Sequence, residues 1–349
     1  MNYDFILVGQ GLAGSILSLT LLKAGYTVCV IDDPDLSSCS SVAAGIWNPV
    51  VFKRLTRSWL AEALVPELLQ FYKEAESTLG TRLIEERAII KSFTEEQEQA
   101  LWMKKALEDA SFLDPQLYQD LQITAVDLIP AYSKVKQAGN LHVKPFLAST
   151  QAYLLKRQSY LQEQFDHTAL RSDDGILSYK HLRATRIVFC EGHLISRNPL
   201  FKEIAMKPAK GEVLTIRCEG LLLTRDILNK GIFILPLDDQ LYKVGATYQW
   251  EQLNDLPTQA AREELLAKLK ALLHVPFEVV AHEAGVRPAV IDRRPVIGEH
   301  PQHKHHYVFN GFGTKAVMLA PFFAKQLLNF IQHAEPLDKE ISASRFYKI

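Results

Sequence analysis

The N-terminal part of the chain alternates between short apolar runs and a segment with helical spacing. Residues 4–9 (DFILVG) form an apolar run that ends at glycines, which is typical of a short strand. Residues 15–23 carry apolar side chains at helical spacing, and residues 26–31 (YTVCVI) form a second apolar run that ends at Asp32 and Asp33. The pattern predicts a strand, a glycine turn, a helix and a second strand, in that order.

The turn in this unit contains Gly9, Gly11 and Gly14 in the spacing GxGxxG. Glycines allow a tight turn, a close approach of the main chain to a pyrophosphate and close packing of helix on strand. An acid about 20 residues further on typically accepts a hydrogen bond from a ribose hydroxyl, and Asp32 is placed for that role. We therefore expect a bound dinucleotide, and the motif alone leaves FAD and NAD open. The alternative is an α/β unit whose glycines only make room for packing.

The pattern changes after Asp33. A nicotinamide dehydrogenase would continue with strands and helices that alternate and feed one sheet. Here a stretch of small residues, SSVAAGIWNPV, shows neither helical nor strand periodicity and leads into a long polar region. That region predicts helices over 57–79 and 95–110 and strands over 82–93 and 121–128. These elements indicate an inserted domain.

The dinucleotide-binding part resumes near Val143. A helical pattern over 145–162 leads to the apolar strand 186–190, which ends at Glu191 and Gly192. A second strand that ends at a glycine is expected where the cofactor crosses the carboxyl ends of the sheet.

The predicted fold class is α/β plus α+β. It combines a Rossmann-like dinucleotide-binding domain on a parallel sheet with a substrate domain on a mixed, largely antiparallel sheet. We expect the first domain to comprise residues 1–55, 142–205 and 284–349, and the second to comprise residues 56–141 and 206–283.

Charge and composition exclude several classes of partner. The 39 Lys and Arg residues nearly balance the 40 Asp and Glu residues, so no excess charge attracts nucleic acid or anionic lipid. The N-terminus does not resemble a signal peptide, and no segment approaches the roughly 20 apolar residues of a membrane span. We expect a cytoplasmic protein with neither nucleic acid nor membrane as a partner.

Cysteines and histidines give no metal site. The four cysteines have no CxxC spacing, which is typical of reduced structural thiols. Four histidines cluster in EHPQHKHHYVF (residues 299–309), and we interpret this segment as a polar loop between two apolar runs rather than as a zinc site.

Several segments, in order, together resemble the D-amino acid oxidase and glycine oxidase family of FAD enzymes. The resemblance spans nearly the whole chain and implies FAD rather than NAD. The segments are the first glycine motif, SSVAAGIWNP, RIVFCEG, KPAKGEVLTI, AGVRPAVIDRRPVIGEH and NGFGTKAVMLAP.

The resemblance implies an extended FAD. Its pyrophosphate would lie over the first glycine turn, the small residues 40–46 would let the main chain approach the flavin, and Leu170 would lie near adenine. A helix beginning near Val317 would direct its N-terminus at the flavin, where Lys315 could add positive charge. The cofactor-binding positions so implied are Gly9, Gly11, Leu12, Ala13, Gly14, Asp32, Asp33, Ser40, Ser41, Ala44, Gly45, Ile46, Leu170, Gly192, Gly311, Gly313, Thr314, Lys315, Ala316 and Val317.

The resemblance also implies a substrate site. Arg287 matches the arginine that binds the substrate carboxylate, and a guanidinium suits bidentate recognition of a carboxylate. A surface or salt-bridged arginine is the alternative. Phe233 and Leu237 stand where amino acid oxidases have tyrosines, so we expect them to form a pocket wall for a different substrate.

The implied chemistry is oxidation of the C–N bond of a small amino acid or secondary amine that carries a carboxylate. A hydride would pass from the α carbon to flavin N5, and O₂ or another acceptor would take the electrons. FAD is expected to be noncovalent, because no cysteine lies near 285–287 in the sequence. A 2-hydroxy acid oxidase, a modified-nucleoside oxidase or a non-catalytic flavoprotein of the same fold remain alternatives, and a homo-oligomer is possible.

Overall fold

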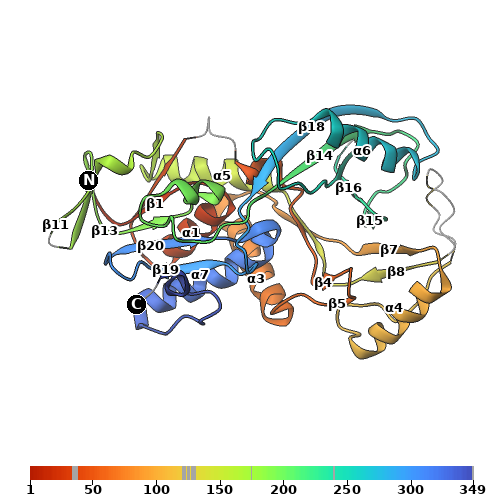
Figure 1. Ribbon diagram of the computed structural model, residues 1–349, viewed down its shortest axis with the longest axis horizontal. Helices are drawn as coiled ribbons and strands as arrows, with labels where there is room; N and C mark the ends of the chain where they lie inside the picture. Colours follow the sequence, from red (N-terminus) through yellow and green to blue (C-terminus); the bar gives the residue numbers. More distant parts are fainter. Residues whose placement is uncertain are drawn as a thin grey trace.

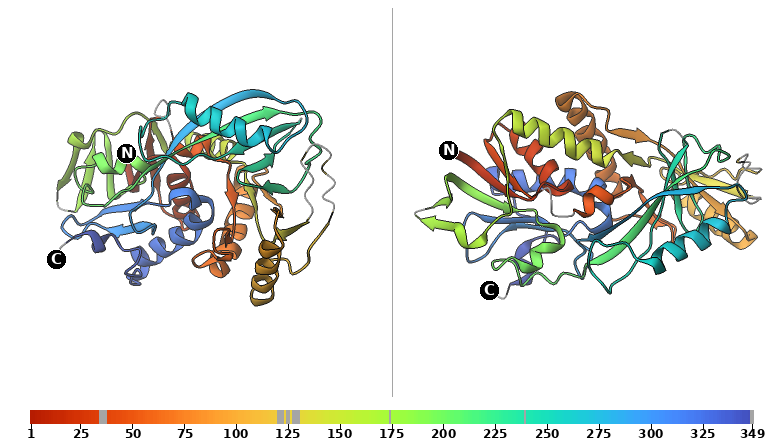
Figure 2. Two further views of the ribbon diagram at one scale, coloured as in Figure 1. Left: turned by 45° about the vertical axis from the view of Figure 1, so that its right-hand side comes forward. Right: turned by 90° about the horizontal axis from the view of Figure 1, so that it is seen from above.

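The computed structural model describes residues 1–33, 38–119, 123, 126, 131–173, 175–238 and 240–347. Two large sheets lie in the two halves of an elongated molecule (Figure 1). Segments from the start, middle and end of the chain share the half that holds the first sheet (Figure 2).

The first sheet has a parallel core. Its order is β10-β2-β1-β13-β20, with β19 antiparallel to β20 at one edge and the hairpin β11-β12 added to β13. The strands are β1 (Asn2–Val8), β2 (Val28–Asp32), β10 (Tyr160–Gln162), β11 (Leu170–Asp173), β12 (Ile176–Tyr179), β13 (Leu182–Phe189), β19 (Val296–Glu299) and β20 (His306–Asn310).

Both faces of this sheet are buried, which explains the unbroken apolar run of β1. Phe5 and Leu7 pack into a core with helices α1 (Leu12–Lys23) and α7 (Ala316–His333). Ile6 and Val8 pack on the opposite face with side chains of β12 and β13. Strands buried on both faces are continuously apolar rather than alternating. Helix α1 also packs against α5 (Val143–Lys156), and α3 (Ala61–Leu79) packs against α7.

The second sheet is mixed and largely antiparallel, with the order β18-β14-β17-β16-β15-β7-β8, and only β15 and β7 pair in parallel. Helix α6 (Gln259–Lys270) covers one face, where Leu265 and Leu269 pack against Leu214 and Ile216 of β14. The strands are β7 (Ile89–Phe93), β8 (Ala131–Val135), β14 (Ala209–Arg217), β15 (Ile227–Asn229), β16 (Phe233–Pro236), β17 (Leu241–Gly245) and β18 (Glu278–Arg287).

Shorter elements connect the two halves. Helix α2 (Cys39–Val42) packs on β18, and α4 (Glu96–Glu108) packs on β7. The small sheets are β3-β9-β6 and β4-β5. The remaining elements are β3 (Ile46–Trp47), β4 (Val50–Val51), β5 (Thr56–Arg57), β6 (Ile84–Glu86), β9 (Gly139–Leu141), η1 (His167–Ala169), η2 (Gly192–Arg197), η3 (Gly313–Lys315) and η4 (Ala343–Phe346).

The predicted fold class is confirmed, and three local predictions need comment. The predicted helix over 145–162 was too long, because α5 ends at Lys156 and Tyr160–Gln162 form β10 beside β2. The stretch predicted without regular structure contains α2 and β3. The strand predicted over 121–128 falls almost entirely outside the described residues.

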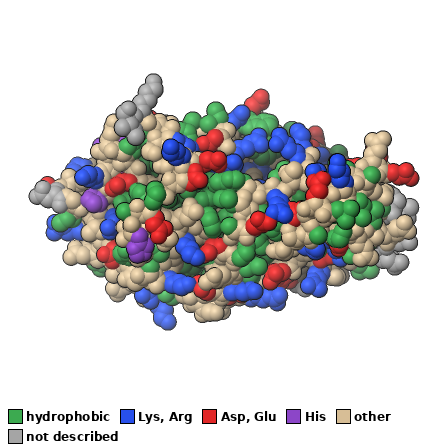
Figure 3. All heavy atoms as spheres, turned by 90° about the horizontal axis from the view of Figure 1, so that it is seen from below, with side chains coloured by type: hydrophobic (Ala, Val, Ile, Leu, Met, Phe, Trp, Pro, Cys, Tyr) green, Lys and Arg blue, Asp and Glu red, His purple; other side chains and the backbone are tan. Residues whose placement is uncertain are grey.

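The surface shows no large area of one charge on the face seen from below, where basic and acidic side chains are interspersed with apolar ones (Figure 3). Within the described parts of the chain, no helix combines the length and apolar character needed to cross a bilayer. Across the same residues, no group of three or more potential ligands is arranged to hold a metal ion.

The histidine segment is not simply a polar loop, because two of its members are core residues. His300 and His306 are each 5% exposed, and the His300 ring packs against Phe201 and Tyr347. The His300 Nδ1 accepts hydrogen bonds from the main-chain N–H groups of Gln302 and His303. Burial lowers the pKa of both His300 and His306 below the usual value of 6.5.

We predict that the stability of the fold decreases on acidification below about pH 6.5. These histidines have a lower pKa in the folded state than in the unfolded state, so unfolding binds protons in this range. Their contribution to stability is complete above 6.5 and is lost as the pH falls through the folded-state pKa. Thermal unfolding between pH 8 and pH 5 measures this loss, and His300→Asn, which keeps an acceptor for the two N–H groups, should reduce the slope. An equal slope in this variant would contradict the assignment.

A candidate dinucleotide and carboxylate site between the two sheets

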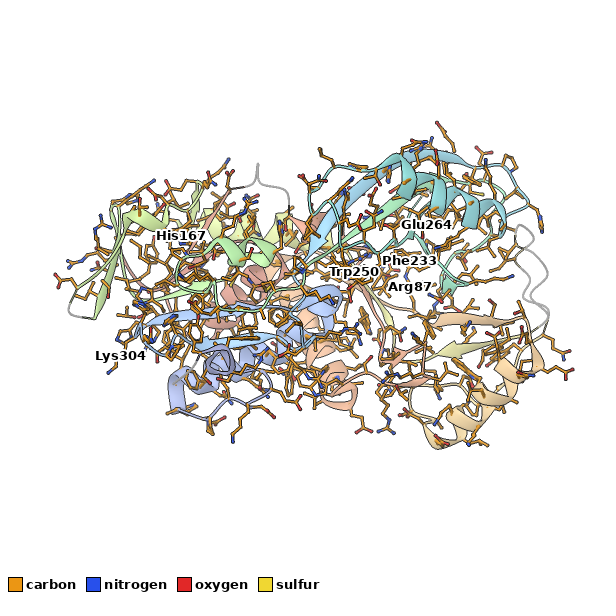
Figure 4. The ribbon with its side chains drawn as sticks, viewed as in Figure 1. Arg87, His167, Phe233, Trp250, Glu264 and Lys304 are labelled. Carbon is orange, nitrogen blue, oxygen red and sulfur yellow. The ribbon has the colours of Figure 1, made fainter. Side chains whose placement is uncertain are left out.

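A single large cavity of about 1030 Å³ extends from the carboxyl edge of the first sheet to the second sheet. Its wall at the first sheet comes from the β1–α1 turn, the end of β2 and the end of β13. Its wall at the second sheet comes from β14, β16 and β18. Figure 4 shows His167 beside the first sheet and Phe233 in the half that holds the second.

The turn between β1 and α1 is held closely by main-chain contacts. A Cβ on Gly9, whose φ is +100°, would lie 2.6 Å from the Cys190 carbonyl oxygen. A Cβ on Gly14 would lie 1.8 Å from the Gly9 carbonyl oxygen. Only glycine fits either position, and the N-terminus of α1 lies on the cavity. A pyrophosphate could bind there through main-chain N–H groups and the helix dipole.

Asp32 ends β2 beside this turn. One carboxylate oxygen accepts a hydrogen bond of 2.8 Å from the Gln10 N–H, and the Tyr160 hydroxyl lies 3.5 Å from the other. Burial raises the pKa of Asp32, although the Gln10 hydrogen bond opposes this shift. The carboxylate therefore braces the glycine turn and still faces the cavity, where a ribose hydroxyl could reach it.

Residues 38–45 form the roof of the cavity. Ser38 caps α2, and the Ser40 hydroxyl accepts a hydrogen bond of 3.0 Å from the Leu12 N–H at the start of α1. Gly45 has a φ of +75°, and a Cβ there would lie 2.0 Å from the Leu141 carbonyl oxygen. The small residues predicted to let the main chain approach a flat ring thus line the cavity, and part of the segment is helical.

The C-terminal segment enters the cavity through η3 and the start of α7. Asn310 ends β20 and donates a hydrogen bond of 3.0 Å from its amide to the Gly192 carbonyl, which joins the two strand ends. Lys315 is the residue before α7, but its ammonium points away from the cavity wall and donates to the Ser58 hydroxyl at 2.8 Å. Burial lowers the pKa of Lys315.

Arg287 ends β18 at the opposite side of the cavity. Its Nη1 and Nη2 both donate to the Thr247 carbonyl at 3.2 Å, and Nη1 also lies 3.4 Å from the Lys210 carbonyl. The guanidinium lies over the Tyr248 ring, 4.9 Å from its centroid, and burial lowers its pKa. No acidic side chain among the described residues pairs with it. A carboxylate could therefore bind along the Nε–Nη2 edge.

The wall next to Arg287 is mainly apolar. Phe233 of β16 lies beside Ile89, Val213 and Ile227, and Asn229 adds one amide. Among the described lining residues that the second sheet and its connections supply, Arg287 is the only charged one. This end of the cavity suits a ligand with one carboxylate and an otherwise uncharged body.

Most of the predicted site residues meet on this cavity, and five do not line it. Leu237 lies on the connection after β16 and is 37% exposed. The alternation of inward and outward side chains along β16 ends with the strand and does not place Leu237. Leu170 begins β11 and lines a separate, smaller cavity, while Phe165 lines the large one. Gly14, Gly311 and Lys315 do not contribute to the surface of the cavity. The predicted residues on the cavity are Gly9, Gly11, Leu12, Ala13, Asp32, Asp33, Ser40, Ser41, Ala44, Gly45, Ile46, Gly192, Phe233, Arg287, Gly313, Thr314, Ala316 and Val317.

Sequence reasoning missed the partners of Arg287. Thr247 acts through its carbonyl, so its side chain carries no signal of the contact. An aromatic near a strand end is more often a core or sheet-surface residue than part of a site, yet Tyr248 lines the cavity. Tyr248 lies three residues after the end of β17, on a connection that returns over β14. This position alone could have suggested that Tyr248 lines the cavity.

Comparison with known proteins agrees with this geometry. Residues 4–329 match the family model described as FAD dependent oxidoreductase. A glycine oxidase from Bacillus licheniformis is 24% identical over 95% of this chain and 93% of its own length.

Solved structures show the same fold. A glycine oxidase from Geobacillus kaustophilus superimposes with a TM-score of 0.78 at 20% identity, covering 99% of this chain and 98% of its own. An iminodiacetate oxidase from Chelativorans sp. BNC1 superimposes with a TM-score of 0.78 at 16% identity, covering 97% of this chain and 99% of its own.

We predict that Asp32→Asn weakens FAD binding about tenfold or more, because a charged acceptor for a ribose hydroxyl becomes a neutral one. The amide oxygen can still accept from the Gln10 N–H, so the turn should persist. Titration of apoprotein with FAD, followed by flavin fluorescence, measures the dissociation constant. Asp226→Asn, on the second sheet and paired with Lys134, is the matched control. Equal affinities in the two variants would remove Asp32 from the cofactor site.

Proposed function

The chain belongs to the FAD-dependent oxidoreductase family whose model it matches from residue 4 to residue 329, and on this premise we propose the substrate and the roles of its residues. As a member, it is an FAD-dependent oxidoreductase acting on amino acids or amines. We propose that it oxidises the C–N bond of a small amino acid or secondary amine that carries one carboxylate. The observation that carries the proposal is the partly buried Arg287 guanidinium with no acidic side chain beside it in the described structure.

The glycine turn, Asp32 and the roof segment 38–45 fit FAD. A bulkier residue at Gly9 would collide with main chain, and the N-terminus of α1 suits the pyrophosphate. When bound, FAD supplies the acceptor for the two electrons and the hydride that leave the substrate.

Arg287 binds the carboxylate in this proposal. Bidentate contact along the Nε–Nη2 edge would fix the orientation of the α carbon, and the apolar residues Ile89, Val213 and Phe233 would exclude water. The substrate loses a hydride from the α carbon and a proton from nitrogen. The resulting imine then reacts with water to give a carbonyl compound and an amine.

The surroundings favour oxidation of the neutral amine. The Arg287 cation and the apolar wall both disfavour a protonated amine. The substrate amine therefore binds as the free base or loses its proton beside Arg287. No side-chain acid or base is then needed at this end of the cavity. The names of the similar proteins, glycine oxidase and iminodiacetate oxidase, support a substrate in which an amine and a carboxylate share one carbon.

We propose that FAD is held without a covalent bond. No cysteine is close to 285–287 in the sequence, but tertiary packing brings one near, since a Cβ on Gly285 would lie 3.2 Å from the Cys39 Cα. Burial raises the pKa of Cys39 to about 11, which Arg287 opposes only in part. The thiol is therefore protonated near neutral pH and is a poor nucleophile.

Substrate identity is tested by anaerobic reduction of the purified FAD-loaded enzyme. We expect glycine, sarcosine or a D-amino acid to bleach the flavin absorbance, and a 2-hydroxy acid such as lactate to leave it unchanged. Bleaching by lactate alone would replace the amine with an alcohol in the proposal. Persistent yellow colour with every compound would indicate a non-catalytic flavoprotein.

We predict that Arg287→Ala raises KM for the carboxylate substrate about 100-fold, because a buried charge-assisted pair is lost. The flavin spectrum should be unchanged, since Arg287 is not part of the cofactor cradle. Steady-state kinetics measure the change. Arg294→Ala, which removes a partly exposed arginine paired with Glu340, is the control. Equal KM values for the two variants would exclude Arg287 as the clamp.

A further inference from the structure

Two oppositely charged side chains of β14 are completely buried. Lys210 and Glu212 are each 0% exposed, and their Nζ and Oε1 atoms lie 3.7 Å apart. Residues at alternate positions of a strand share one face, so both lie on the α6 side with Leu214 and Ile216. Between them, Gly211 faces the cavity, where a Cβ would lie 1.8 Å from Nη2 of Arg287.

Both charged groups hold one segment, residues 247–258, which we call the strap. The Lys210 ammonium donates to the Asn254 side-chain oxygen at 2.9 Å and to the Leu256 carbonyl at 2.5 Å. Glu212 adds an ion-pair contact to these two hydrogen bonds of the ammonium. The Glu212 carboxylate accepts from the N–H and the hydroxyl of Thr258, each at 2.8 Å.

The main chain of the same two residues holds the start of the strap. Lys210 exchanges N–H to carbonyl hydrogen bonds of 2.8 and 3.0 Å with Gln249. The Glu212 N–H donates to the Thr247 hydroxyl at 3.0 Å, and the Thr247 N–H donates to the Glu212 carbonyl at 3.2 Å. The strap is thus fixed to β14 at both ends.

The strap has almost no apolar packing of its own. Trp250 is 57% exposed, and Leu253 and Leu256 are also exposed. Trp250 lies near the junction of the two halves of the molecule, where its ring contacts that of Tyr248 (Figure 4). Without a hydrophobic face, the strap depends on hydrogen bonds and charge for its position.

The strap in turn fixes Arg287. The Thr247 carbonyl accepts from both Nη atoms of the guanidinium, and the Tyr248 ring lies beneath its plane. A shift of the strap would rotate the guanidinium and misalign its free edge. Bidentate recognition is sensitive to such a rotation.

We propose that Lys210 and Glu212 are positioning residues for substrate binding, because they lock the strap that orients Arg287. The inference rests on the proposed carboxylate site. A buried ion pair does not generally stabilise a fold more than apolar residues of the same size would. The pair instead fixes the position of the strap, because the ammonium and the carboxylate each form hydrogen bonds with defined atoms of the strap. Nε2 of His282 is a further neighbour of the Glu212 carboxylate, at 2.9 Å.

The test uses the FAD-loaded enzyme and benzoate as a carboxylate probe, whose dissociation constant is read from the shift of the flavin absorbance. We expect Lys210→Met to weaken benzoate binding about tenfold and Asn254→Ala about threefold, in line with the loss of a buried and of an exposed hydrogen bond. In substrate turnover, KM should rise while kcat changes little. Lys134→Met removes another lysine of the second sheet that is also paired, and should leave benzoate affinity unchanged.

A double-mutant cycle separates positioning from general loss of stability. If Lys210 acts through Arg287, adding Lys210→Met to Arg287→Ala causes no further loss of affinity. An independent tenfold loss in the Arg287→Ala background would overturn the proposal. Asn254 is exposed, so Asn254→Ala keeps the test decisive if Lys210→Met fails to fold, and unchanged affinity in a folded Asn254→Ala protein would also overturn the proposal. If Arg287→Ala itself leaves benzoate binding unchanged, the proposed carboxylate site fails instead.

Discussion

A partly buried guanidinium that donates to main-chain carbonyls is the constraint on which this site depends. Arg287 donates to the Thr247 carbonyl and lies over Tyr248, and no carboxylate of the described structure neutralises it. Burial of an unneutralised cation is costly, and the cost is recovered when an anion arrives. The glycine at 211 follows from the space that this group needs, because a Cβ there would lie 1.8 Å from Nη2 of Arg287.

The cofactor end of the cavity is built on a different principle. There the main chain itself forms the surface, because glycines at 9 and 14 bring β1, α1 and β13 into contact closer than any Cβ would allow. Peptide N–H groups at the start of α1 could attract a phosphate without any side-chain cation. The two ends meet where α2 packs on β18, so the roof segment 38–45 and the proposed carboxylate clamp share one junction. Lys243 of β17 reinforces it by donating to the Val42 carbonyl at the end of α2, at 2.9 Å.

Buried charge serves two purposes in the second sheet. At Arg287 a partner is missing from the described residues, which marks a place for a ligand. At Lys210 and Glu212 both charged groups are paired and hydrogen-bonded within the protein, which fits a role in positioning the strap. The contrast lies in hydrogen-bond satisfaction rather than in burial, because all three side chains are largely removed from solvent.

The order of the elements, the glycine turn and Asp32 at the end of β2 could be predicted from the sequence, because local periodicity and short motifs carry them. Arg287 was singled out by the resemblance of its segment to a known family. The shape of the substrate end could not. The sequence does not distinguish Phe233 from Leu237, which both stand where related enzymes have tyrosines. Of these two, Phe233 lines the cavity and Leu237 does not. Leu237 follows the end of β16, and the alternation along a strand does not predict where a residue in the following turn lies. Cys39 lies about 250 residues before Gly285 in the chain and beside it in space. The sequence by itself determined the glycine turn and the acid of a dinucleotide-binding unit, because that chemistry is local, and the family resemblance singled out Arg287 as the arginine proposed to bind a carboxylate. Only the tertiary structure decided what surrounds that arginine, because main-chain carbonyls and the strap reach it through packing between distant segments.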